Sequence, residues 1–241
     1  MELIILGAGY GFPGIATMLK CNNSYYLIDA GVPVAELMHQ KGLPFEALRA
    51  AFISHRHGDH IIGLSNLAFL STSGYKKSPL EVYFPEECCL TGFRTLLLSA
   101  KDSINEERLQ MKLYEPGTFY RDENITVTAV PTDHIKGLHP AYALVIDGGG
   151  KRIVFTGDLH REDPYDFPKI AEEQPSDAII CEMEHFHIDA LVPHLEKCQT
   201  KQFLFHHYNA PWSLDELKAL QCNDPFSAPI RIVQDGDHIL L

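Results

Sequence analysis

Short runs of apolar, β-branched and aromatic residues recur along the whole chain, and Gly, Pro, Asn or Asp bounds each run. Such runs are typical of strands with at least one buried face. They predict strands at residues 2–6, 25–29, 51–54, 80–84, 110–114, 125–130, 141–146, 152–155, 177–181, 202–206 and 230–234, with a second short strand at the end of the chain.

Apolar residues at helical spacing alternate with these strands and predict helices at residues 34–40, 61–70, 86–98, 168–173, 188–197 and 214–220. Many strands with helices returning at intervals favour a layered α/β or α+β sandwich. The sequence contains no internal repeat, low-complexity segment or Gly/Ser/Pro-rich linker. We therefore expect one domain over residues 1–241.

Charge narrows the classes of partner. The 241 residues carry 20 Lys+Arg against 32 Asp+Glu, a net charge of −12, and most of the excess lies in the second half. An acidic chain disfavours long nucleic acids and anionic membranes, because neutralising phosphates requires clustered Lys and Arg. The N-terminus lacks the pattern of a signal peptide, and no apolar run is long enough to span a membrane. Six cysteines without a C-x-x-C pair indicate a reduced, cytoplasmic protein.

The segment from Gly9 to Gly14 matches the G-x-G-x-x-G pattern of dinucleotide-binding loops, and Asp29 follows about twenty residues later. The third glycine of that pattern should open a long helix, but a Cys-Asn-Asn-Ser turn signal follows at residues 21–24. Pro13 also removes an amide that the loop could offer to phosphate. We therefore predict a hairpin-type turn between Leu6 and Ile15.

The strongest chemical signal is the pattern H-x-H-x-D-H in residues 55–60, between an apolar strand and an apolar helix. Residues i and i+2 of an extended segment point the same way, so His55 and His57 can reach one cation together. Asp59 and His60 follow the turn that Gly58 allows and can hold a second cation. Imidazole and carboxylate ligands suit zinc, and also manganese or iron.

With this motif the sequence resembles the metallo-β-lactamase-fold hydrolase superfamily. The resemblance covers most of the chain and implies an α+β protein, a four-layer αββα sandwich of two mixed β-sheets flanked by helices. It also implies further ligands after later strands. Candidates occur in order: His134, Asp158 and the pair His206-His207 each follow a predicted strand.

The resemblance implies two divalent metal ions, with zinc expected and manganese or iron as alternatives. One ion would take His55, His57 and His134, the other Asp59, His60 and the last histidine, and Asp158 would bridge them. We favour His207 as the last ligand, because the family pattern places one spacer residue after the strand. His206 is the alternative.

Among these residues we assign catalytic roles to Asp59 and to His185. A histidine at the position of His185 is thought to act as general acid in similar enzymes, with Glu182 or Glu184 beside it, and His187 is the alternative. We expect Asp29 to orient a ligand histidine rather than to bind metal itself.

Within the superfamily, the chain is most similar to ribonuclease Z-type and related phosphodiesterases. Gly58, the opening Leu6-Gly7-Ala8-Gly9 and the Phe155-Thr156-Gly157-Asp158 segment carry this likeness. The basic Gly/Pro-rich arm that grips tRNA is missing. We therefore expect hydrolysis of a small anionic phosphodiester, such as a cyclic nucleotide, by a water that two metals activate, and long nucleic acid is disfavoured.

Three other functions stay open. They are tRNA 3′-end cleavage of the ribonuclease Z type, hydrolysis of another ester, thioester or lactone, and a non-catalytic metal-binding module. Many true β-lactamases have a cysteine at the position of Asp158, which disfavours penicillin hydrolysis. Homodimers are common among similar proteins, although nothing in this sequence specifies one.

Overall fold

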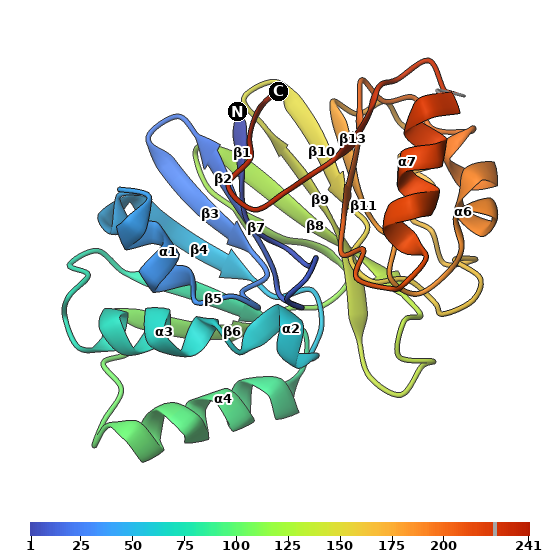
Figure 1. The fold of residues 1–241 in the computed structure, drawn as a ribbon. Helices are drawn as coiled ribbons and strands as arrows, with labels where there is room; N and C mark the ends of the chain where they lie inside the picture. The colour runs from blue at the N-terminus through green and yellow to red at the C-terminus, as the bar shows by residue number, and fades with distance from the viewer. Residues whose placement is uncertain (224–225) are drawn as a thin grey trace.

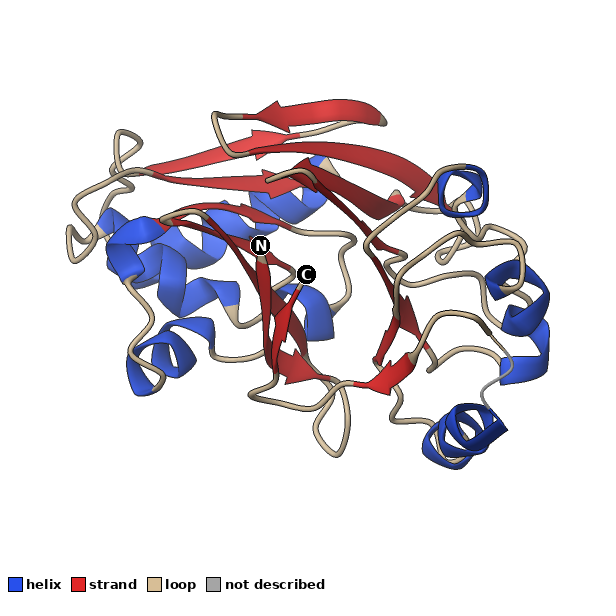
Figure 2. Ribbon diagram, turned by 90° about the horizontal axis from the view of Figure 1, so that it is seen from above, coloured by secondary structure: helices blue, strands red, loops and turns tan. Residues whose placement is uncertain are grey.

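The computed structural model describes residues 1–223 and 226–241. Two seven-stranded sheets pack face to face, and helices cover their outer faces (Figures 1 and 2). The strand orders are β14-β1-β2-β3-β4-β5-β6 and β13-β12-β11-β10-β9-β8-β7, each with parallel and antiparallel pairs. The predicted αββα sandwich of two mixed sheets is therefore confirmed.

The first sheet consists of β1 Glu2–Ala8, β2 Ile15–Cys21, β3 Ser24–Ile28, β4 Leu48–Phe52, β5 Leu80–Phe84, β6 Leu109–Leu113 and β14 His238–Leu240. The second consists of β7 Gly117–Arg121, β8 Ile125–Thr132, β9 Ala141–Gly148, β10 Lys151–Phe155, β11 Ala178–Glu182, β12 Phe203–His206 and β13 Ile230–Ile232. The helices are α1 Val34–Gln40, α2 Gly58–Ile61, α3 Leu64–Thr72, α4 Glu87–Ala100, α5 Lys169–Glu173, α6 Ile188–Leu195 and α7 Ser213–Asn223, with a 3-10 turn at Phe45–Ala47.

The structure differs from the sequence pattern in three elements. The pattern missed β2 and β7. The predicted helix at residues 61–70 is instead two helices that meet at Gly63. The turn between Leu6 and Ile15 is present, since β1 and β2 form an antiparallel pair around it. The G-x-G-x-x-G segment therefore opens a strand and not the helix of a dinucleotide-binding fold.

Alternate side chains of β1 pack into two different hydrophobic clusters, one on each face of the first sheet. Leu3 and Ile5 belong to the hydrophobic cluster that lies between the sheets and continues beneath α6 and α7. Ile4 and Leu6 belong to a second cluster, which packs the other face of the first sheet against α1, α3 and α4. Successive side chains of a strand point to opposite faces, so one apolar run supplies both interfaces.

The arrangement of the strands brings several chain segments to one edge of the sandwich. β3 and β4 are parallel, and so are β10, β11 and β12. β8 runs in the same direction as β10, because β9 lies antiparallel between them. The carboxyl ends of these strands therefore present their following residues at the same edge, which is where sheet proteins commonly assemble sites. Among the described residues, no helix has both the length and the apolar character required to cross a bilayer.

Lys76 is a buried cation in the connection between α3 and β5. Its ammonium group donates to Ser78 Oγ and, at 3.3 Å, to the carbonyl of Glu46. Burial disfavours the charged form and lowers the pKa of Lys76 to about 8. The folded protein then binds fewer protons than the unfolded chain between the folded pKa and the ordinary lysine value, so stability rises with pH across that window.

We expect Lys76→Met to increase the free energy of unfolding at pH 7 by roughly 1–3 kcal/mol. Ser78 Oγ still donates to the Glu46 carbonyl, at 2.8 Å, so this carbonyl keeps a hydrogen bond when the ammonium group is removed. Urea unfolding of both proteins from pH 7 to 10 measures the effect. The advantage of the variant should shrink as pH rises, and an advantage independent of pH would assign it to packing instead of charge.

Candidate metal centre

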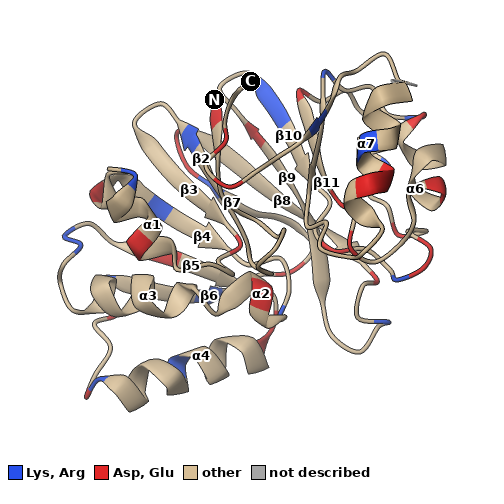
Figure 3. Ribbon diagram, viewed as in Figure 1, with Lys and Arg blue, Asp and Glu red and all other residues tan. Residues whose placement is uncertain are grey.

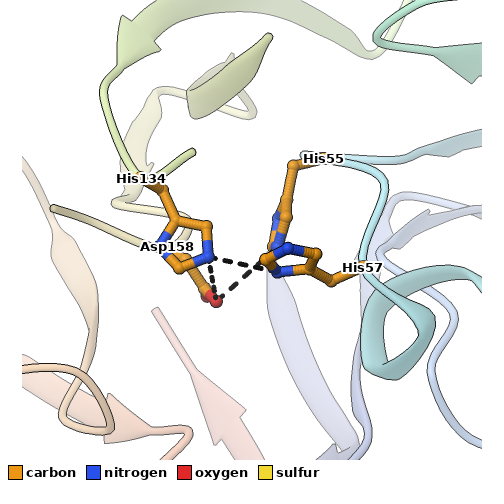
Figure 4. A group of neighbouring side chains, drawn as sticks. All are labelled: His55, His57, His134 and Asp158. Atoms are coloured by element: carbon orange, nitrogen blue, oxygen red, sulfur yellow. Dashed lines mark hydrogen bonds and ion pairs between the residues drawn. The ribbon is translucent and has the colours of Figure 1, made fainter. Parts of the chain in front are cut away.

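Four side chains meet at the strand-end edge of the sandwich: His55, His57, His134 and Asp158 (Figure 4). Nε2 of His134 lies 3.1 Å from Nδ1 of His57 and 3.6 Å from Oδ2 of Asp158. Nε2 of His55 lies 3.7 Å from the same oxygen. One donor atom from each of the four lies within 4.8 Å of the others.

A second group, Asp59, His60 and His207, adjoins the first. Nε2 of His207 lies 3.5 Å from Asp59 Oδ2, and Nε2 of His60 lies 3.8 Å from it. Asp158 faces this group too, because its Oδ1 is 3.4 Å from His60 Nε2 and its Oδ2 is 3.3 Å from His207 Nε2. Both groups therefore share one carboxylate that is only 3% exposed.

The donor atoms of the two groups have the chemistry of a cation site. Nε2 of His55, His60 and His207 is buried in each case and finds no hydrogen-bond partner in the described part of the chain. Burial lowers the pKa of His55, His57 and His134, which favours the neutral imidazole that ligates metal. Unpartnered buried nitrogens beside carboxylates are costly without a cation between them. The residues present therefore fit divalent metal ions.

Hydrogen bonds behind the two groups fix the orientation of the rings. Asp29, which follows β3, accepts from His60 Nδ1 at 2.8 Å and from the backbone amide and hydroxyl of Ser54 at 2.7 and 2.8 Å. The Leu159 carbonyl accepts from His134 Nδ1 at 2.8 Å. In each ring Nδ1 carries the proton, so that Nε2 presents its lone pair to the centre.

Two glycines allow α2 to approach the end of β3. A Cβ on Gly31 would lie 1.6 Å from the carbonyl oxygen of Asp59, and one on Gly63 would lie 1.6 Å from that of Val32. The close approach lets Ala30 donate to the His60 carbonyl at 2.7 Å. Any side chain at either glycine would push the helix that carries Asp59 and His60 away from Asp29.

A comparison with models of protein families identifies the family of this chain. The model of the family described as Anti-Pycsar protein Apyc1 matches residues 1–222. The chain belongs to this family. The crystal structure of the metallo-β-lactamase fold protein YhfI from Bacillus subtilis superposes with a TM-score of 0.80, covering 99% of this chain and 98% of that one at 19% identity. The Apyc1-family chain thus has the metallo-β-lactamase fold that its motifs predicted.

Two other proteins are similar to the Apyc1-family chain. Human tRNase Z, short form, superposes with a TM-score of 0.75 at 17% identity, covering 100% of this chain and 99% of that one. Ribonuclease Z of Listeria innocua serovar 6a is 33% identical over 147 residues, which are 56% of this chain and 46% of that protein. The match therefore spans about half the length of this relative. It supports the predicted likeness to the ribonuclease Z branch.

His185 and Glu182 form a dyad against the centre of the Apyc1-family chain. His185 Nδ1 lies 2.7 Å from Glu182 Oε2 and 3.8 Å from Asp158 Oδ2. Glu182 is fully buried at the end of β11, and its carboxylate also accepts from the amides of Leu159 and Glu184. Burial opposes protonation of His185, but the hydrogen bond and charge of Glu182 outweigh it and raise the pKa of His185.

The structure places the two alternative histidines elsewhere. His206 is buried, its Nδ1 has no hydrogen-bond partner among the described residues, and burial lowers its pKa to about 3. His206 belongs to none of the groups of metal-ligating side chains in the described residues, whereas His207 does. The side chain of His187 is 63% exposed, hydrogen-bonds Glu216 at 2.7 Å and packs on Trp212.

Sequence reasoning did not identify Ser54 as a residue of the centre. Its hydroxyl lies 3.1 Å from His55 Nδ1 and donates to Asp29, so it connects two parts of the site. The only signal was a small polar residue between an apolar strand and the first histidine of the motif.

Proposed function

We propose that residues 1–241 form a single binuclear metal-dependent phosphodiesterase domain that acts on a small phosphodiester, such as a cyclic nucleotide. The observation that carries this proposal is the pair of donor groups that share the buried carboxylate of Asp158. Two-metal sites of this kind are typical of enzymes that break phosphate esters.

In this proposal His55, His57 and His134 would hold one divalent ion, Asp59, His60 and His207 would hold the other, and Asp158 could contribute to both. Zinc suits these nitrogen and oxygen donors, and so do manganese and iron. His207 is preferred to His206 because only its ring faces Asp59 and Asp158 among the described contacts.

When bound, the two ions supply an activated water and the positive charge that offsets an anionic transition state. The protein contributes the remaining chemistry. Glu182 accepts the Nδ1 proton of His185 and thereby holds the ring so that Nε2 can give a proton to the leaving oxygen. Asp29 keeps His60 in the tautomer that presents Nε2 to the centre.

The distribution of charge supports a small substrate. Figure 3 shows acidic residues on α6, α7 and α2. Lys151, Arg152 and Lys201 lie close together, but Asp177 pairs with both lysines and Asp147 pairs with Arg152. A long nucleic acid needs several clustered cations to neutralise successive phosphates, whereas a small anion needs only the local charge of the centre.

A second candidate is cleavage of RNA of the ribonuclease Z type. The named relative at 33% identity favours it, although the match spans 46% of that protein. The two candidates share the same centre and differ in what binds around it.

The experiment that separates the candidates is a substrate screen on metal-replete protein. We expect hydrolysis of bis(p-nitrophenyl) phosphate and of cyclic nucleotides, little hydrolysis of p-nitrophenyl acetate, and no cleavage of a precursor tRNA. His57→Ala should remove the activity, and His39→Ala, at an exposed position of α1, should not. Tight metal binding without turnover on any substrate would support a non-catalytic module instead.

Asp29→Asn tests how the centre is held. We expect this variant to weaken divalent metal binding about 10- to 100-fold, as for other residues that orient a ligand histidine. The asparagine removes the charge behind His60 and cannot accept from His60 and both Ser54 donors at once. Competition with a chromophoric chelator measures the affinity. Asp215→Asn, at an exposed position in the first turn of α7, is the matched control and should bind metal like the parent protein.

A further inference from the structure

A second cluster of metal-ligating side chains lies outside the Asp158 centre: Glu86, Cys88 and His139. Glu86 immediately precedes α4, and Cys88 is the second residue of that helix. His139 lies in the loop after β8, five positions beyond His134. One donor atom of each residue lies within 4.8 Å of the others. Two segments far apart in sequence therefore bring a thiol, a carboxyl and an imidazole together.

The three donors form a set that suits zinc. Thiolate, imidazole and carboxylate all bind this ion, and three protein ligands leave a fourth position for water. A thiolate and a carboxylate together neutralise a divalent charge. Glu86 Oε1 is buried and makes no hydrogen bond within the described chain. His139 Nδ1 donates to Glu86 Oε2 at 2.9 Å, which leaves the lone pair on Nε2.

The guanidinium of Arg56 lies against the imidazole and the carboxylate of this set. Its Nη1 lies 2.8 Å from the ring nitrogens of His139 and 3.5 Å from Glu86 Oε1. The Arg56 side chain is 38% exposed, so it can turn into solvent. A metal ion and the guanidinium compete for the same acceptor atoms. They cannot occupy this position together, because two positive charges so close to each other repel.

We propose that Glu86, Cys88 and His139 form a third metal site, which binds a thiophilic divalent cation such as zinc in place of Arg56. This site does not depend on the proposed hydrolysis. A metal ion at this site releases Arg56, which lies between His55 and His57. The ion also joins the start of α4 to the loop that carries His134. The third site and the Asp158 centre are therefore connected through two segments, residues 55–57 and residues 134–139.

Cobalt titration of the metal-free protein distinguishes the two kinds of site. Thiolate bound to Co²⁺ gives an intense charge-transfer band in the near ultraviolet, whereas nitrogen and oxygen ligands do not. We expect wild-type protein to bind three equivalents, one of them with this band. Cys88→Ser should lose the band and one equivalent. Cys222→Ser, at an exposed cysteine of α7, should keep both.

Arg56→Gln provides a gain-of-affinity test. We expect it to bind the band-forming equivalent more tightly than wild type, because the competing cation is gone. His139→Ala should weaken that equivalent and leave the other two unchanged. Two equivalents without a thiolate band in wild type, or a band that persists in Cys88→Ser, would overturn the third site. Neither outcome bears on hydrolysis, since the donors of the Asp158 centre contain no sulfur.

Discussion

Asp158→Asn is expected to remove phosphodiester hydrolysis almost completely, by at least about 10²-fold, the loss typical when one group that stabilises transition-state charge is removed. Asp158 is the residue that faces both donor groups, within 3.3–3.7 Å of His55, His60, His134 and His207. Asparagine has the same shape but carries no charge, and its amide hydrogens would face lone pairs of the imidazoles. Both metal ions should therefore bind more weakly.

Elemental analysis after dialysis, together with turnover of bis(p-nitrophenyl) phosphate, measures this effect. Asp163→Asn is the matched control, because Asp163 is exposed and lies five residues farther along the same segment. Thermal unfolding of both variants shows whether the fold is retained. A folded Asp158→Asn protein that keeps two ions and normal turnover would refute the shared role of this carboxylate.

The sequence predicted most of the strands, because each of those has a distinct apolar run with turn residues at its ends, and the resemblance of its motifs implied the four-layer architecture. It missed β7, Gly117–Arg121, because Gly117, Thr118 and Arg121 are exposed and the apolar alternation is weak there. It predicted one helix where α2 and α3 meet at Gly63. Gly63 approaches the carbonyl oxygen of Val32 too closely for a side chain, and the local pattern does not contain this contact. Local patterns do not record a contact between residues far apart in the chain.

The histidine motif predicted that imidazole and carboxylate side chains form a cation site, because donors at a strand end and in the following turn must lie close together. It left open the choice between His206 and His207, since a shift of one residue at a strand end exchanges the two faces. The hydrogen bonds of Ser54 and the carbonyl of Leu159 could not be predicted, because they depend on how β8, β10 and the β4 segment meet in space.

The cluster of Glu86, Cys88 and His139 illustrates the same limit. None of the three residues forms a recognisable spacing pattern with the others, and only the packing of the β5–α4 turn against the loop after β8 brings them together. Motifs reveal sites whose ligands are close in sequence. Sites assembled from single residues require the fold.

His185→Gln is expected to slow hydrolysis of a cyclic nucleotide by about 10²- to 10⁴-fold, the usual contribution of a general acid. The ribose oxygen is a poor leaving group and needs a proton. p-Nitrophenolate leaves without one, so the same variant should hydrolyse bis(p-nitrophenyl) phosphate at a rate much closer to that of the parent protein. The ratio of the two losses measures proton donation and separates it from damage to the metal centre.

Glu182 holds His185 through the 2.7 Å hydrogen bond to Nδ1, so Glu182→Gln should show the same dependence on leaving group with a smaller loss. His187→Gln is the matched control, because His187 lies two residues away and its side chain is 63% exposed. Its rates on both substrates should equal those of the parent protein. Equal losses on the two substrates in His185→Gln would assign this residue to metal binding, and a larger loss in His187→Gln would make that histidine the proton donor.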